Sequence, residues 1–184
     1  GEAMSIGRTF KEALQKALRS LEIDSYGFET KNDGVETSLD SIRERLQTPN
    51  AQRLWYVAEA LRLGMDVDEL YQVSRIDPWF LDNIAQIIAF EKEVQSSKSQ
   101  VQSRSSELID SSLLRRAKQM GFSDVRLGCL LGVSEDAVRA QREQLDIIPV
   151  YKTVDTCAAE FVAHTPYLYS TYEEEDESQP PARK

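Results

Sequence analysis

The sequence predicts an all-α, or mainly α, fold: a multi-helix bundle in two sub-bundles, with short extended segments at the N-terminus and after residue 147. Three features support this prediction. Apolar residues recur at helical spacing along most of the chain. The helical runs begin at Ser, Thr or Asp residues, which are typical helix N-caps, and end at glycine or before proline. Hydrophobic residues make up 41% of the 184 residues, which is enough to build a core.

The N-terminal part predicts an extended segment and then a helix. Residues 1–8 are short and interrupted by glycine. Thr9 and Glu12 have the spacing of a capping box, in which each side chain bonds the backbone N–H near the other. The helix that they open has its apolar face at Phe10, Ala13, Leu14, Ala17, Leu18 and Leu21. A loop over residues 24–37 then leads to a second helix, which Ser38 caps and which ends before Thr48-Pro49.

The central stretch, residues 50–93, predicts three helices with the main core. The first covers residues 51–63. Asp66 begins the second, and Glu69 completes a capping box with it. Asp77 begins the third as an N-cap, followed by Pro78, which lacks the N–H that the first helical turn leaves unpaired. The third helix has a broad apolar stripe of Phe80, Leu81, Ile84, Ile87 and Ile88.

A polar stretch and a second helical group follow. Residues 95–107 are rich in Ser, Gln, Lys and Arg, so we interpret them as a linker whose first residues can extend the preceding helix. The first sub-bundle therefore covers residues 9–94. The second covers residues 108–147, with helices capped by Ser111 or Ser112, then by Ser123 and Ser134. Residues 148–172 are predicted to be extended, and residues 173–184 form an acidic, proline-containing linker outside the fold.

The composition excludes several classes of protein. The formal net charge of −9 argues against nucleic acid or an anionic membrane surface as a main partner. No apolar run approaches the roughly 20 residues of a membrane span, and no secretory signal is visible. Cys129 and Cys157 have neither the number nor the spacing of a disulfide framework or a metal site, which is typical of reduced cysteines in a cytoplasmic protein. The chain begins with Gly1, which suggests a piece excised from a longer protein.

The sequence predicts no catalytic, cofactor-binding or metal-binding residues. No glycine-rich phosphate loop is present. His164 is the only histidine, and a Cys157–His164 nucleophile pair is disfavoured because the neighbours of Cys157 in the sequence are acidic and nothing visible would activate its thiol. We interpret Trp55, Trp79 and Phe80 as core residues in preference to a ligand cage.

Residues 122–145 give an alternative function. Their pattern of a short helix, a Gly-Val-Ser turn and a second helix is that of a helix-turn-helix DNA-binding or protein-binding module. The second helix opens with Glu135 and Asp136, which phosphates repel, although Arg139 and Arg142 could reach a DNA backbone.

Several motifs together resemble one family. They are Gly1–Thr9; Asp66–Leu70 and Ile76–Leu81; Lys118–Asp124; and Pro149–Phe161 with Thr165–Glu173. These residues are similar to the large subunit of bacterial-type, glutamine-dependent carbamoyl-phosphate synthase. The resemblance covers nearly the whole chain. It places residues 1–8 at the end of the first synthetase half, the helical region in the oligomerisation domain, and residues 148–172 in the lead-in to the second half.

The resemblance implies a function for the parent enzyme. Such an enzyme is an ATP-dependent ligase that makes carbamoyl phosphate from ATP, bicarbonate and glutamine-derived ammonia for arginine and pyrimidine synthesis. Its ATP, magnesium and potassium sites lie in two ATP-grasp halves that would flank this segment, and a glutamine amidotransferase small subunit is a further partner. The fragment itself is implied to be non-catalytic, without cofactors, and cytoplasmic.

The resemblance also suggests where contacts lie. Glu2 could face the internal carbamate tunnel of the family. We expect a dimer or tetramer to form through this domain, with part of the interface on residues 50–93. The candidate interface side chains are Trp55, Leu63, Tyr71, Trp79 and Phe90.

Overall fold

The computed structural model describes residues 2–30, 38–101, 108–157, 160–161 and 167–178, without the side chains of 98–101. The helices are α1 (Phe10–Arg19), α2 (Leu39–Gln47), α3 (Arg53–Arg62), α4 (Val67–Ser74), α5 (Pro78–Val101), α6 (Ser111–Gln119), α7 (Asp124–Leu131) and α8 (Glu135–Gln144), and the strands are β1 (Val150–Val154) and β2 (Tyr167–Thr171). The prediction of a mainly α fold is confirmed.

Local capping explains why most helices begin where they do. Ser38, Ser123 and Ser134 each accept a hydrogen bond from the backbone N–H three residues on, as predicted. Asp66 and Glu69 form the full reciprocal capping box. At the start of α5, the N–H of Trp79 donates to Asp77 Oδ1 over 2.8 Å. These side chains satisfy N–H groups that the first helical turn leaves without partners.

Two predicted caps differ from those observed. Helix α6 is capped by Asp110 and not by Ser111 or Ser112, because Asp110 Oδ2 accepts from the N–H groups of Ser112 and Leu113. Thr9 caps α1 by accepting from Glu12 N, but the reciprocal half of the predicted box is missing. Glu12 Oε2 instead accepts from the backbone N–H of Arg8.

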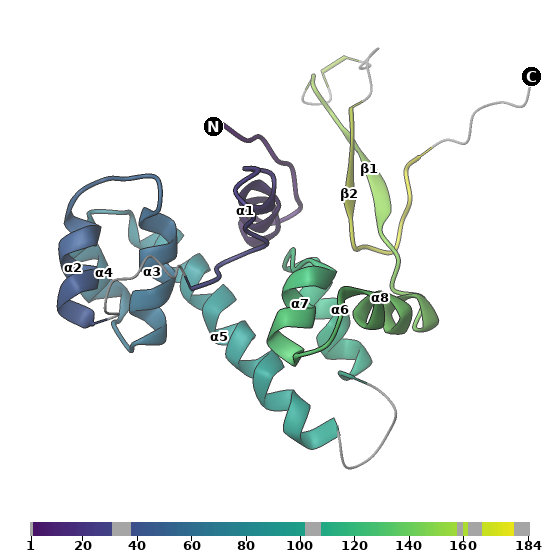
Figure 1. Cartoon of the computed structure of the whole chain (residues 1–184). Helices are drawn as coiled ribbons and strands as arrows, with labels where there is room; N and C mark the ends of the chain where they lie inside the picture. The colour runs from purple at the N-terminus through teal and green to yellow at the C-terminus, as the bar shows by residue number, and fades with distance from the viewer. Residues whose placement is uncertain (1, 31–37, 102–107, 158–159, 162–166, 179–184) are drawn as a thin grey trace, which may run out of the picture.

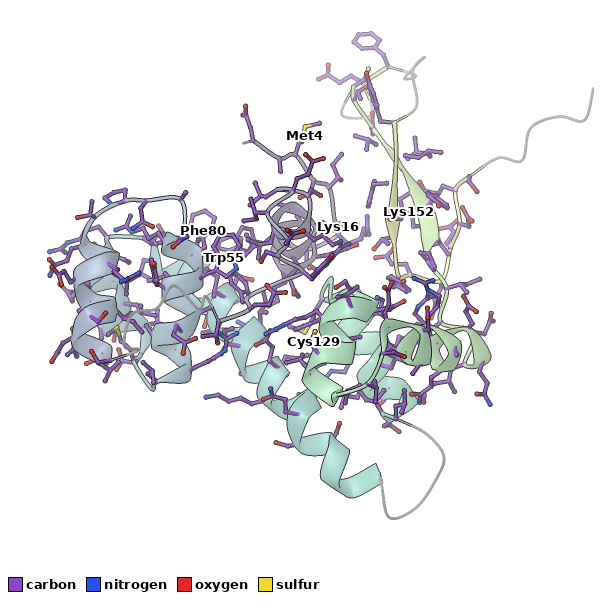
Figure 2. All side chains as sticks on the ribbon, in the orientation of Figure 1. Met4, Lys16, Trp55, Phe80, Cys129 and Lys152 are labelled. Carbon is purple, nitrogen blue, oxygen red and sulfur yellow. The ribbon has the colours of Figure 1, made fainter. Side chains whose placement is uncertain are left out.

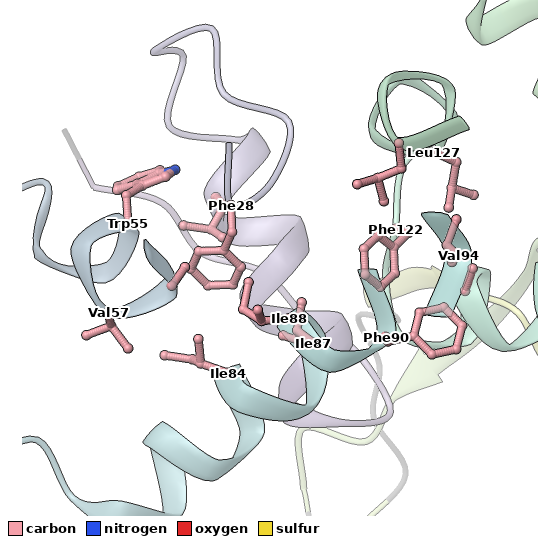
Figure 3. Close-up of a cluster of buried hydrophobic side chains, with 14 of the residues drawn as sticks. Phe28, Trp55, Val57, Ile84, Ile87, Ile88, Phe90, Val94, Phe122 and Leu127 are labelled. Carbon is pink, nitrogen blue, oxygen red and sulfur yellow. The ribbon is translucent and has the colours of Figure 1, made fainter. Parts of the chain in front are cut away.

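Helix α5 is shared by both groups of helices. Figure 1 shows α2, α3 and α4 gathered at one end of α5, α6 to α8 beside its other half, and α1 between the groups. Ile84, Ile87 and Ile88 lie toward the first group, whereas Phe90 and Val94 lie toward the second (Figure 3). The buried apolar side chains form one continuous core. The two groups predicted from the sequence are therefore joined through a common helix.

Part of the predicted linker is helical, and one predicted loop contributes a side chain to the core. Helix α5 continues to Val101, so residues 95–101 of the predicted linker are helical, while residues 102–107 lie outside the described residues. Phe28, in the predicted loop over 24–37, is fully buried in the core beside Trp55 (Figure 3). Loop residues 31–37 also lie outside the described residues.

The extended region after residue 147 is an antiparallel hairpin. Strands β1 and β2 pair from Val150 opposite Thr171 to Val154 opposite Tyr167, which confirms the extended prediction for both segments. The acidic run that follows was predicted to lie outside the fold, and this is wrong for its first residues. The N–H of Glu177 donates to the carbonyl of Tyr151 over 2.8 Å, and Lys152 lies 3.4 and 3.2 Å from the carboxylates of Glu175 and Glu177. Ion pairing and a backbone bond thus hold the run against β1.

Candidate interaction surface and buried ion pairs

Three aromatic rings, two of them exposed and one partly buried, form a cluster where α1 and α5 begin. Trp79 and Phe80 are 57% and 43% exposed, and Phe10 of α1 lies against both, with ring centroids 5.0 and 5.3 Å away. Trp79 and Phe80 meet edge to face at 5.0 Å. We call these three residues the aromatic surface (Phe80 is labelled in Figure 2). Because water contact with large rings is unfavourable, such a cluster commonly marks a binding surface.

The interpretation of Trp79 and Phe80 as core residues is therefore wrong, whereas it is right for Trp55. Successive residues of a helix are rotated by about 100°. Leu81 and Ile84 face the core, and Trp79 points away because it lies about 160° from Leu81 around the helix. Phe80 lies only about 40° from Ile84, but in the first turn of α5 it is still 43% exposed. Trp55 lies inside because α3 is enclosed, and its indole Nε1 donates to the carbonyl of Gly27 over 3.0 Å.

The five candidate interface residues divide into two sets. Trp79 and Leu63 are exposed, at 57% and 40%, and Tyr71 is partly buried. Trp55 and Phe90 are only 3% and 4% exposed, so they have almost no side-chain surface to offer a partner. Phe90 packs on Phe122 with ring centroids 5.5 Å apart. Trp55 and Phe90 are corrected to core residues.

Helix α1 joins the α6–α7 turn. Gln15 Nε2 donates to the carbonyl of Met120 over 2.9 Å, and Arg19 Nη1 donates to the carbonyl of Gly121 over 2.8 Å. Gly121 has φ +94°, and a Cβ at this position would lie 2.8 Å from the Cα of Glu12. The close approach of the two backbones therefore requires glycine.

Helix α1 also joins the hairpin. Glu12 Oε2 accepts from Thr171 Oγ1 over 3.2 Å, and Glu12 Oε1 lies 2.8 Å from Lys16 Nζ. Lys16 Nζ also donates to the carbonyl of Ser170. At the surface, Arg8 Nε pairs with Glu173 over 2.8 Å. Residues from both ends of the described chain thus meet at α1, and the spacing rule that suggested a capping box could not reveal this long-range role of Glu12.

Two buried ion networks connect the helices. Glu91 of α5 accepts from Arg126 of α7 over 2.6 Å and from Arg62 of α3 over 2.8 Å. Separately, Asp124 pairs with Lys118 over 2.7 Å and with Arg142 over 3.1 Å. Each carboxylate bonds two cations, which compensates the cost of removing these charges from water. The sequence signals neither network, since the pairs lie 6 to 35 residues apart.

The remaining residues considered for chemistry are Glu2, Cys129, Cys157 and His164. Glu2 is exposed, Cys129 is exposed and Cys157 is partly buried. His164 lies outside the described residues, so the Cys157–His164 pair is not tested. Within the part of the chain that the structure describes, no group of three or more His, Cys, Asp or Glu residues is placed to hold a metal ion. No helix among the described residues has both the length and the apolar character needed to cross a bilayer.

The helix-turn-helix geometry is present, but it does not support DNA binding. Helices α7 and α8 are joined through Gly132, whose φ of +69° ends α7. Arg139 pairs with Glu135 of its own helix over 2.5 Å, and Arg142 is buried against Asp124. Both arginines considered for phosphate contact are therefore engaged within the protein, and the alternative function is not supported.

The fold and its surfaces define a class of protein, a helical interaction domain with an exposed aromatic surface. Residues 2–146 match the sequence model of the family described as carbamoyl-phosphate synthetase large chain, oligomerisation domain, and the chain belongs to this family. It is 46% identical over its full length to the carbamoyl phosphate synthase large chain of Archaeoglobus fulgidus and 48% identical to that of Pseudomonas aeruginosa. The chain spans 17% of the length of each of these relatives.

A third relative is named as one section of such a large chain. The chain is 48% identical, over 94% of its length, to a protein of Aquifex aeolicus named carbamoyl phosphate synthase large chain, N-terminal section. The match covers 29% of that relative. The resemblance seen in the sequence motifs is confirmed.

Proposed function

We propose that this oligomerisation domain belongs to a carbamoyl-phosphate synthase large chain, in which it spaces two ATP-grasp halves and pairs with a second copy. The parent enzyme would be the ATP-dependent ligase of arginine and pyrimidine synthesis, working in the cytoplasm with a glutamine amidotransferase small subunit. ATP, Mg²⁺ and K⁺ would bind in the flanking halves. The names of the relatives support this assignment.

The observation that carries the pairing role is the exposure of the aromatic surface. Trp79 and Phe80 leave two large rings in water although the same helix buries Leu81 and Ile84 fully or nearly so. Aromatic residues are enriched at the centres of protein interfaces, where replacing one of them with alanine can cost about 2 kcal/mol or more of binding free energy. A second copy of the domain would cover these rings, with Leu63 and Tyr71 as further candidates.

The test is the mass of the intact large chain by light scattering with Trp79→Ser or Phe80→Ser. We expect either substitution to shift the assembly toward the monomer. Tyr167→Ser is the matched control, because Tyr167 is 60% exposed but lies on the hairpin, and it should leave the mass unchanged. If the Trp79→Ser large chain assembles as the unsubstituted protein does, the aromatic surface is not the interface.

We further propose that the segment supplies shape and contact surface but no reacting group. We also propose that Glu2, which is exposed, faces the internal carbamate tunnel of the parent enzyme. The purified 184-residue chain should not hydrolyse ATP. Turnover that copurifies with the chain and is lost on substituting one of its own residues would contradict this proposal.

A further inference from the structure

A polar cavity lies between the two groups of helices. It has a volume of about 340 Å³, and its lining includes Arg62 of α3, Glu91 and Lys92 of α5, and Arg126 and Cys129 of α7. We call it the ionic pocket. Cys129, which is labelled in Figure 2, is exposed to solvent. Pockets for small molecules in proteins start at roughly 300 Å³, so the space suits a compact ligand.

The carboxylate in the lining, Glu91, is already hydrogen-bonded. Glu91 Oε1 accepts from both Nε and Nη2 of Arg126, over 2.9 and 2.6 Å. Glu91 Oε2 accepts from Arg62 Nη2 over 2.8 Å. The carbonyl of Phe28 also accepts from both arginines. These bonds hold the guanidinium groups of Arg62 and Arg126 at fixed positions.

Two further carboxylates, Glu59 and Glu29, lie near these arginines and are also hydrogen-bonded. Glu59 accepts from Arg62 Nη1 over 3.1 Å and from the Thr30 hydroxyl over 3.2 Å. Glu29, which also attracts Arg126, accepts from the backbone N–H groups of Tyr26 and Gly27. Glu59 thus bonds a lining arginine, and Glu29 bonds backbone amides.

What the pocket still offers is hydrogen-bond donors. Among the described residues, Arg126 bonds through Nε and Nη2 and Arg62 through Nη1 and Nη2. Arg126 Nη1 and Arg62 Nε therefore remain as donors for a ligand, together with the ammonium of the exposed Lys92. All three groups are cationic, and they come from three different helices. A ligand with several oxygen acceptors and negative charge would satisfy them together, and planar guanidinium groups match phosphate oxygens particularly well.

We propose that the ionic pocket binds a small phosphate-bearing anion, which contacts Arg62, Lys92 and Arg126 and so connects the two groups of helices. The anion would complete the bonding of two guanidinium groups that Glu91 and the carbonyl of Phe28 already share. This site is separate from the aromatic surface and does not depend on the proposed oligomer.

The test uses Cys129 as a reporter of occupancy and inorganic pyrophosphate as the probe. The 184-residue chain is alkylated with iodoacetamide at constant ionic strength, set with KCl, and modification of each cysteine is followed by peptide mass spectrometry. The rate at Cys129 should fall roughly tenfold when pyrophosphate is at ten times its Kd, because only the unoccupied fraction reacts. Cys157 lies outside the pocket and should react at the same rate throughout.

Two variants distinguish binding of pyrophosphate in the ionic pocket from its general attraction to positive charge on the protein. Lys92→Ala removes an exposed side chain whose loss should not unfold α5, and it should raise the Kd for pyrophosphate roughly tenfold, the effect of one charge-assisted hydrogen bond. Arg115→Ala changes the net charge equally at an exposed position on α6 and should leave Kd unchanged. The proposal is overturned if pyrophosphate does not slow Cys129, if it slows Cys157 equally, or if both variants bind alike.

Discussion

The ammonium of Lys118 lies 2.7 Å from Oδ1 of Asp124, and both side chains are buried. Arg142 Nε approaches the other oxygen of Asp124 at 3.1 Å. Burial alone would raise the pKa of Asp124, but the attraction of Lys118, with its hydrogen bond, and of Arg142 holds that pKa below the ordinary value of 3.8. Burial in turn lowers the pKa of Lys118, and Asp124 opposes this shift.

The pH dependence of stability follows from the lowered pKa of Asp124. The unfolded chain binds this proton more tightly than the folded one, so the contribution of Asp124 is complete above a pH of about 5 and is lost as the pH falls through about 4 toward the folded pKa. Glu29 acts in the same direction, because hydrogen bonds from Ser25 and from backbone amides outweigh its burial and lower its pKa. Urea unfolding between pH 7 and pH 2 should show a flat free energy and then a fall. An NMR titration in which the Asp124 carboxyl has a pKa above 3.8 would contradict this explanation.

Removing Asp124 should be far more costly than removing an exposed carboxylate. Asp124→Asn leaves Lys118 and Arg142 buried without their anion, and we expect a loss of about 3–5 kcal/mol in the free energy of unfolding. Asp68→Asn is the control, because Asp68 is exposed in the first turn of α4, and its change should be within about 0.5 kcal/mol. Equal urea midpoints for the two variants would show that the buried pair contributes little.

Two glycines with similar φ angles should respond differently to alanine. Gly64 has φ +96° and open space where a Cβ would be, so Gly64→Ala should cost about 1–2 kcal/mol of backbone strain. At Gly121, with φ +94°, a Cβ would also lie 2.8 Å from the Cα and 3.0 Å from the carbonyl oxygen of Glu12. We expect Gly121→Ala to cost about 1–3 kcal/mol more, since α1 must move away. Chemical denaturation of both variants measures the difference, and equal losses would mean that the contact between α1 and the α6–α7 turn is not tight.

Replacing the buried Trp55 should cost more stability than replacing the exposed Trp79. Trp55→Ala empties a buried volume and removes a bonded indole, so the free energy of unfolding should fall by about 3–5 kcal/mol. Trp79→Ala removes a ring that is more than half exposed, and its cost should stay below about 1.5 kcal/mol. Thermal unfolding of the chain at a concentration where it is monomeric separates this effect from assembly. A larger loss for Trp79 than for Trp55 would reverse the assignment of core and surface.

Short-range features of the fold could be predicted from the sequence, because they depend on residues three or four apart. Ser38, Ser123 and Ser134 were identifiable as caps, since the hydroxyl and the N–H that it bonds belong to the same turn. The neighbouring candidates Asp110, Ser111 and Ser112 show the limit of this rule. All three can cap, and only the path of the backbone selects Asp110.

Long-range features could not be predicted in this way. Trp55 and Trp79 both lie in apolar helical runs, and which one is covered depends on the neighbouring helices. The role of Glu12 depends on Thr171, 159 residues away, and the bridging role of Glu91 depends on Arg62 and Arg126. The site residues suggested from the family likeness therefore needed the three-dimensional packing to separate Trp55 and Phe90 from Trp79.

The shared helix α5 has a mechanical consequence. Ile87 lies toward the first group of helices and Phe90 toward the second, so the two contacts are less than one turn apart, or about 4.5 Å along the helix axis. A rotation imposed by either group of helices therefore acts on the same helix. A displacement of helices α2 to α4 should therefore be passed through α5 to helices α6 to α8.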